Sequence, residues 1–243
     1  MLKQINLIFQ KEFCSFFRTR LAYFVLGIYL FLSMFCTFYL GLYFDVLNAN
    51  LFSFFYFQVN ILMLVVPALT MRLWADEYKT GSIELLLTRP LSYTSVVIGK
   101  FLAAWGLCLL MLVCTFPLWL YTATNLSADN LNIAASYFGC FLISGSMCAV
   151  GCMVSAFNKN PIVAYLGSVL LLTLLITVNY NFIFNGLNLS GSLIIRFTQS
   201  LNFFYHQSTL LNGQLGLDNI IYYATITVLT LWLNRITIEY KRS

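Results

Sequence analysis

The first apolar stretch of the chain runs from Leu21 to Phe44 and contains 24 residues without Asp, Glu, Lys, Arg or His. As an α-helix it would be about 36 Å long, at about 1.5 Å per residue. This length exceeds the roughly 30 Å hydrocarbon core of a bilayer. The chain is 60% hydrophobic and only 9% charged, whereas a soluble domain carries about 25% charged residues. The sequence therefore predicts an integral membrane protein.

Five further apolar stretches follow the first one, and each is long enough to approach the length of a membrane-spanning helix. The last stretch is the shortest, and it reaches a full span only if Arg235 extends its side chain to the membrane surface. The sequence predicts one all-α polytopic transmembrane domain over residues 1–243. We place its six spans at about residues 21–44, 51–71, 101–121, 133–157, 161–184 and 219–238.

The basic residues test this count independently, because cytoplasmic segments of membrane proteins are enriched in Lys and Arg. With six spans, twelve of the 13 basic residues fall on the side of the N-terminus, and only Arg196 falls on the other side. A five-span or seven-span arrangement would remove this asymmetry. We therefore expect both termini in the cytoplasm. The net charge of +5 is then a topology signal, and no nucleic-acid partner is expected.

Polar residues inside the predicted spans are few, the main ones being Gln58, Asn60 and Asn179. No Asp, Glu, Lys, Arg or His lies at the predicted mid-bilayer depth, where such residues mark proton and ion pathways. This favours an external energy source over proton-coupled transport. His206 is the only histidine, and the seven cysteines contain no C-x-x-C pair. We expect a solvated or hydrogen-bonded histidine, buried structural thiols and no metal or cofactor.

Two segments show informative patterns. Residues 2–18 place apolar side chains at spacings of three and four, which predicts an amphipathic helix lying in the cytoplasmic membrane interface. In the fourth span Cys140, Ser144, Cys148 and Cys152 recur every four residues. Small residues at this spacing let helices approach closely, so we expect a packing function, with a substrate groove as the alternative.

The predicted cytoplasmic loop, residues 72–100, contains the most distinctive pattern. A short apolar helix over residues 83–87 has Ser82 as its expected N-cap and is stopped by Pro90. An exposed apolar helix indicates a docking site, although the loop could instead pack beneath its own bundle. The residues alone leave both possibilities open.

The motif Glu77-x-x-x-Gly81-Ser82-Ile83-Glu84-Leu85-Leu86-Leu87-Thr88-x-Pro90, followed by Val96–Lys100, resembles the signature loop of ABC-2 type exporter permeases. It is most similar to the branch that includes the gliding-motility permease and the nitrous-oxide-reductase maturation permease. Ser82 stands where the family more often has Thr.

The resemblance implies a permease subunit in a prokaryotic inner membrane that forms a homodimer or heterodimer and binds a separate cytoplasmic ATPase. The segment from Glu77 to Thr88 would be the coupling helix, with Glu77 and Glu84 making polar contacts to the ATPase and Leu85, Leu86 and Leu87 supplying an apolar face. Residues 2–18 would be the connecting helix. Spans two and five would line the protomer interface, and Gln58, Asn60 and Asn179 could line the pathway.

ATP hydrolysis is not expected in this chain. A phosphate-binding loop needs G-x-x-x-x-G-K-[ST], whereas Gly99-Lys100 has Thr94 at the first glycine position and is followed by Phe101. Two alternatives to a transporter remain. One is a membrane scaffold that recruits a cytoplasmic protein through residues 72–100, and the other is a membrane enzyme, which one histidine and no intramembrane carboxylate make the weaker alternative.

Overall fold

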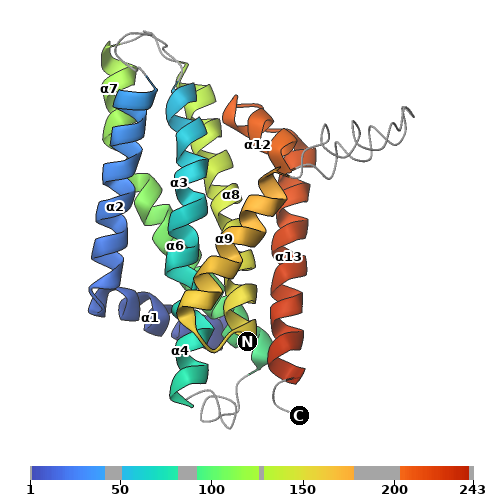
Figure 1. The fold of residues 1–243 in the computed structure, drawn as a ribbon. Helices are drawn as coiled ribbons and strands as arrows, with labels where there is room; N and C mark the ends of the chain where they lie inside the picture. The colour runs from blue at the N-terminus through green and yellow to red at the C-terminus, as the bar shows by residue number, and fades with distance from the viewer. Residues whose placement is uncertain (1, 42–50, 82–91, 126–128, 178–202, 241–243) are drawn as a thin grey trace.

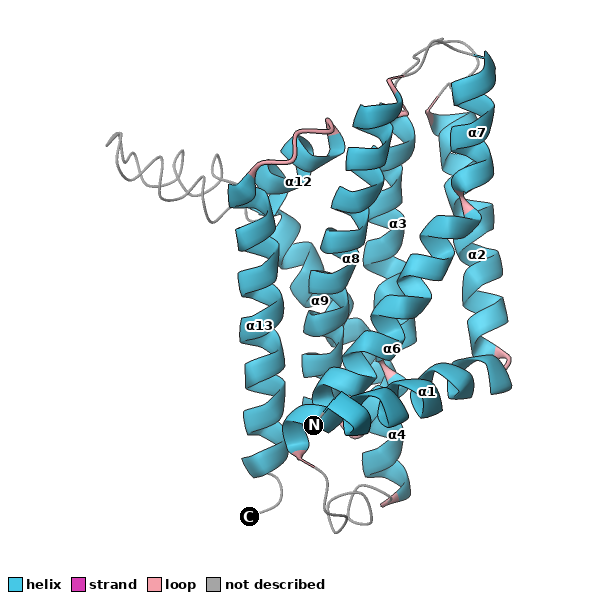
Figure 2. Cartoon of the chain, turned by 180° about the vertical axis from the view of Figure 1, so that it is seen from behind, coloured by secondary structure: helices cyan, strands magenta, loops and turns pink. Residues whose placement is uncertain are grey.

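A computed structural model describes residues 2–41, 51–81, 92–125, 129–177 and 203–240, and these residues form helices without a β-strand. Most helices run side by side along one axis, whereas α1 lies across one end of the bundle (Figures 1 and 2). The elements are α1 (Leu2–Arg18), α2 (Leu21–Phe35), the π-helical segment η1 (Cys36–Leu40), α3 (Phe52–Thr70), α4 (Arg72–Thr80), α6 (Tyr93–Cys114), α7 (Phe116–Asn125), α8 (Asn130–Phe157), α9 (Pro161–Thr177), α12 (Phe203–Leu211) and α13 (Leu217–Tyr240).

Four helical stretches are long and apolar enough to cross a membrane, and they correspond to the first four predicted spans. They are Leu21–Leu40, Ser53–Thr80, Tyr93–Thr124 and Asn130–Phe157. The fifth predicted span begins as expected at Pro161, but α9 is a shorter apolar helix and residues 178–184 lie outside the described part. The sixth coincides with α13, which has 24 residues but is not among the four.

The third predicted span is longer than expected and is interrupted. Helix α6 begins at Tyr93, eight residues before the predicted start at residue 101, and the helix breaks at Thr115 before α7 continues. Pro117 lies in the first turn of α7, where its missing N–H group does not remove a helical hydrogen bond. Pro117 therefore lies just after the break between α6 and α7, and the hydrophobic pattern alone does not reveal this break.

Residues 72–80 were predicted as part of the cytoplasmic connection between spans two and three, with a helix expected only from Glu77 onward, but the whole segment is helical. After the single residue Met71, the chain continues from α3 into α4. Helix α4 ends at Gly81, whose φ of +71° lies in the left-handed region that glycine adopts at low cost. The expected short helix at residues 83–87 lies outside the described residues.

Helix α8 packs against several neighbours through its small residues, which confirms the packing function expected for the fourth span. Cys140, Ser144, Cys148 and Cys152 are all buried. A Cβ atom on Gly145 would lie 2.9 Å from the Trp105 ring of α6. Backbone approach this close is possible only because the side chains are small.

Helix α1 is the amphipathic helix predicted over residues 2–18. Its apolar face packs along α6: a Cβ atom on Gly99 would lie 2.7 Å from the Ile8 side chain, and one on Gly106 would lie 3.5 Å from Phe9. Helices α1 and α4 and the C-terminal end of α13 lie at the same end of the bundle (Figure 1).

At the opposite end, α12 packs against α13. His206 is buried, its Nδ1 lies 2.6 Å from Oδ1 of Asn219, and its ring stacks on Tyr222 with a centroid separation of 4.2 Å. The histidine is therefore hydrogen-bonded, which was one of the two environments expected for it.

Candidate functional site at the junction of α1, α4 and α6

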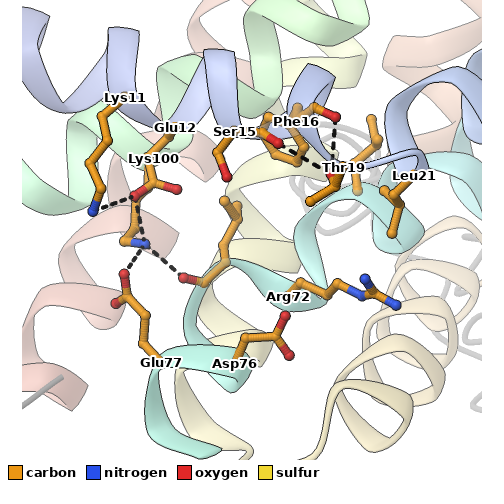
Figure 3. A pocket seen from close by; sticks show the side chains of 12 residues that line it. Lys11, Glu12, Ser15, Phe16, Thr19, Leu21, Arg72, Asp76, Glu77 and Lys100 are labelled. Carbon is orange, nitrogen blue, oxygen red and sulfur yellow. Dashed lines mark hydrogen bonds and ion pairs between the residues drawn. The ribbon is translucent and has the colours of Figure 1, made fainter. Parts of the chain in front are cut away.

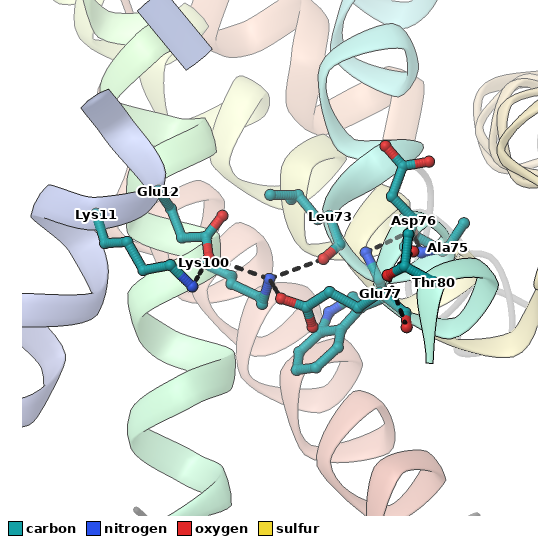
Figure 4. Close-up of polar contacts among 10 residues, drawn as sticks. Lys11, Glu12, Leu73, Ala75, Asp76, Glu77, Thr80 and Lys100 are labelled. Atoms are coloured by element: carbon teal, nitrogen blue, oxygen red, sulfur yellow. Dashed lines mark hydrogen bonds and ion pairs between the residues drawn. The ribbon is translucent and has the colours of Figure 1, made fainter. Parts of the chain in front are cut away.

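Lys100 of α6 is a buried cation, with only 1% of its surface exposed. Its Nζ donates to Oε1 of Glu77 at 2.7 Å, to Oε1 of Glu12 at 3.3 Å and to the Leu73 carbonyl at 2.8 Å. Figure 4 shows the ammonium group between α1 and α4, with these acceptors converging on it. Lys100 therefore connects three helices that lie far apart in the sequence. We call Lys100, Glu12 and Glu77 the Lys100 cluster.

The surroundings of the Lys100 cluster offset the cost of burying an ammonium group. Two carboxylates and one carbonyl take up its three N–H donors, and the Trp74 ring centroid lies 4.9 Å from Nζ, within the range of a cation–π interaction. Nζ of Lys11 lies 3.7 Å from Oε1 of Glu12 and adds a second positive charge beside that carboxylate. Charges buried in this way are strongly coupled, because removing one partner leaves the others without compensation.

A second contact fixes the start of α4. The Ser155 hydroxyl of α8 donates to the Met71 carbonyl at 2.9 Å and accepts from the backbone N–H groups of Trp74 and Ala75 at 3.2 and 3.3 Å. The first N–H groups of a helix have no partner within the helix. Ser155 therefore acts as an N-cap supplied by another helix, and it holds α4 at the point where α3 ends.

These contacts indicate a mechanical role for the junction. Helix α4 is joined to α1 and α6 through the Lys100 cluster and to α8 through Ser155, so a displacement of α4 must also displace these helices or break buried polar contacts. Breaking such contacts costs about 1–3 kcal/mol for each unsatisfied group. Among the described residues, no group of three or more His, Cys, Asp or Glu side chains could hold a metal ion.

Replacing Ser155 by alanine tests the cap. We expect S155A to lower the free energy of unfolding by about 1–3 kcal/mol, because two backbone N–H groups lose their acceptor in a buried site. Denaturant titration in mixed micelles would measure this change. Ser146→Ala is the matched control, since Ser146 is also buried on α8 but donates only to Ile143 of its own helix. Equal losses of unfolding free energy in the two variants would contradict the capping role of Ser155.

The predicted coupling residues fall partly inside this junction. Glu77 lies on α4 and one of its oxygens is engaged by Lys100, while Gly81 ends the same helix. The other predicted coupling residues, Ser82, Glu84, Leu85, Leu86, Leu87 and Pro90, lie outside the described residues, and their role stays a prediction.

The three predicted pathway residues differ in their surroundings. Gln58 is fully buried, and its Nε2 donates to the Tyr29 hydroxyl of α2, so it joins two helices within the chain. Asn60 is exposed on α3, and its Nδ2 donates to the Tyr56 carbonyl at 2.9 Å. Asn179 lies outside the described residues.

The sequence interpretation did not identify Lys100, Glu12 or Ser155 as site residues. A signal for two of them was present: Glu12 is the only acidic residue before Asp45, and Lys100 is directly followed by an apolar span. Charges placed beside apolar helix surfaces need a partner. Ser155 had no such signal, since serine is an ordinary residue in a helix that packs through small side chains.

A helical bundle with four helices of membrane-spanning length and a buried charged junction at one end defines a polytopic membrane protein. Its junction holds helices together and includes Glu77, the first residue of the chain's most distinctive motif. Residues 7–234 match the family model described as ABC-2 family transporter protein. The chain therefore belongs to the ABC-2 transporter family and is a transmembrane permease of the ABC transporter class. None of the curated proteins matches it.

Proposed function

We propose that this chain is the permease subunit of an ATP-binding-cassette exporter, driven by a separate cytoplasmic ATPase. The observation that carries the proposal is the position of α4. This helix continues a membrane-spanning helix, is connected to three other helices by Ser155 and Lys100, and leads directly into the motif at residues 81–90. A force applied to that motif would reach the bundle through α4.

In this proposal the ATPase binds the segment from Gly81 to Pro90, with Glu84 and Leu85, Leu86 and Leu87 as its contacts. Because Oε1 of Glu77 is paired with Lys100, we assign Glu77 mainly to the transmission of force within the permease. ATP hydrolysis moves the segment, and the movement passes from α4 to α1 and α6 through the Lys100 cluster. The chain itself hydrolyses no ATP and needs no cofactor.

We further propose six spans, with α9 and α13 as the fifth and sixth. Both termini, α4 and the motif segment then lie in the cytoplasm, and the membrane is the inner membrane of a prokaryotic cell. The positions of α1, α4 and the end of α13 at one end of the bundle support this arrangement. The resemblance of residues 77–100 supports our further proposal that the chain belongs to the branch of the gliding-motility and nitrous-oxide-reductase maturation permeases.

A dimer accounts for a polar group on the outer surface of α3. Tyr56, Asn60 and Leu64 are exposed at spacings of four residues and so share one helix face. An asparagine facing lipid would leave its amide poorly satisfied, because lipid chains offer no hydrogen bonds. We therefore propose that this face meets a second permease subunit, with Asn60 at the interface or in the pathway. Helix α9 contacts α3, and we assign it to the same interface.

Co-purification with a soluble ATPase tests this function. We expect Glu84→Gln combined with Leu86→Ala to abolish the dependence of ATP turnover on the permease, because the docking segment loses one charge and much of its apolar surface. Leu217→Ala, which alters an exposed leucine at the opposite end of the bundle, should leave this dependence unchanged. If turnover still depended on the permease in the double variant, the coupling assignment would be wrong. If no ATPase associated, the scaffold alternative would replace the transporter.

A further inference from the structure

A pocket of about 260 Å³ lies in the corner where α1 meets α2, beside the passage from α3 to α4. Its lining residues come mainly from α1, α2, α3, α4 and α6, and Figure 3 shows their side chains. Phe16, Leu21 and Leu69 form an apolar part, while Lys11, Arg72 and Asp76 contribute charges outside the Lys100 cluster. Lys11 and Arg72 are exposed, so the pocket opens to the surface of the molecule.

The pocket lies where two spans change from apolar to charged. Arg18 and Arg20 lie just before the start of α2, and only Met71 separates Arg72 from the end of α3. Lys and Arg side chains at the ends of spans mark the level of the lipid head groups. A molecule in this pocket would therefore meet apolar side chains on the bilayer side and charged side chains on the water side, as an amphiphile requires.

The charges in the pocket wall are balanced but incompletely paired. Arg72 and Asp76 form no ion pair or side-chain hydrogen bond with the described residues, although they are separated by one helical turn. Figure 3 shows the Arg72 guanidinium group directed away from the Asp76 carboxylate. In addition, Oε2 of Glu77 is buried without a hydrogen-bond partner in this part of the structure. The wall thus offers the guanidinium group of Arg72 for a phosphate and carboxylates for a cationic group.

We propose that this pocket binds the head group of a phospholipid that carries a primary ammonium beside its phosphate. The phosphate pairs with Arg72, for which a guanidinium group is well suited, and the ammonium donates to Asp76. The acyl chains then pass the partly exposed side chains of Phe16 and Leu21 into the bilayer. An anionic lipid without an ammonium would leave the Asp76 carboxylate unpaired and facing its phosphate.

A quaternary ammonium head group fits less well for two reasons. It has no N–H donor for a carboxylate, and it is usually recognised by several aromatic rings that surround it. Phe16 is the single aromatic residue among the twelve that line the pocket. The pocket should therefore distinguish phosphatidylethanolamine from phosphatidylcholine, although both carry the same phosphate.

The test uses the full chain in nanodiscs that contain equal amounts of the two lipids with identical acyl chains. After transfer to detergent, native mass spectrometry measures which lipid stays bound. We expect the wild type to retain phosphatidylethanolamine several-fold more than phosphatidylcholine. D76N should reduce this ratio to about one, D76E should restore it, and R72Q should lower the retention of both lipids.

Two controls address charge in general. Lys79→Gln removes a cation from α4 outside the pocket, and Asp218→Asn removes an exposed carboxylate at the opposite end of the bundle, so neither should change the ratio. Thermal midpoints in pure phosphatidylcholine identify any variant that is misfolded. Equal retention of both lipids by the wild type, or a preference that survives in D76N, would overturn the proposal. Full displacement by soluble phosphoethanolamine would also overturn it, since the ligand would then be a soluble metabolite.

Discussion

Replacing Lys100 by methionine is expected to lower the free energy of unfolding by about 3–5 kcal/mol, because removing one member of a buried ion pair leaves the other charge uncompensated. In this protein two carboxylates, Glu12 and Glu77, lose their shared cation, and the Leu73 carbonyl loses a donor. Methionine keeps much of the apolar length of lysine, so the effect reports mainly on charge. Unfolding by SDS titration in mixed micelles would measure it.

The triple variant E12Q/E77Q/K100M separates charge from packing. Because no buried charge is left unpaired, we expect it to regain most of the stability that K100M loses. Arg235→Met is the matched control for a simple ion pair, since Arg235 and Glu239 are paired at 2.7 Å but both are substantially exposed. Such exposed pairs contribute up to about 1 kcal/mol. A K100M effect no larger than that of R235M would contradict the proposed Lys100 cluster.

Replacing Gly151 by alanine is expected to destabilise the protein by about 1–3 kcal/mol, in the range of overpacked cores. A Cβ atom at this position of α8 would overlap with Oγ1 of Thr70 and would lie 3.0 Å from its Cβ, which belongs to the last residue of α3. The contact lies next to Met71, so separating these helices would also disturb the start of α4. Denaturant titration against the wild type would measure the loss.

Gly27 is the control for this substitution. A Cβ atom there would have no neighbour within 4 Å, and an alanine in place of a helical glycine is favourable by about 0.5–1 kcal/mol. We therefore expect G27A to be neutral or slightly stabilising. T70A should recover part of the loss in G151A, because the hydroxyl that the new methyl group meets is removed. A neutral G151A would show that α3 and α8 are not held at this separation.

The fold was predictable from the sequence where a repeating pattern decides it. The apolar runs locate the first four spans, and the spacing of three and four identifies α1, because burial of one helix face dominates the energetics there. The small residues of the fourth span likewise indicate close packing, and the contacts of Gly145 with Trp105 and of Gly151 with Thr70 confirm it.

The continuation of α3 into α4 was not predictable in the same way. Residues 72–80 are polar, so hydrophobicity indicates a loop, while their helical structure depends on a hydroxyl from Ser155, more than 70 residues later in the chain. The partners of Lys100 come from segments 23 and 88 residues away. Such contacts arise from the assembled bundle, and a sequence pattern does not encode them locally.

Helix α4 is proposed to reach the cytoplasm and to receive force there, and cysteine labelling tests on which side of the membrane it lies. The measurement compares K79C, at an exposed position of α4, with L131C, which lies exposed at the opposite end of the bundle. Both variants carry Cys14→Ser, because Cys14 is exposed on α1. A membrane-impermeant maleimide added to intact cells should label L131C and should reach K79C only after the membrane is permeabilised. Labelling of K79C in intact cells would contradict the account.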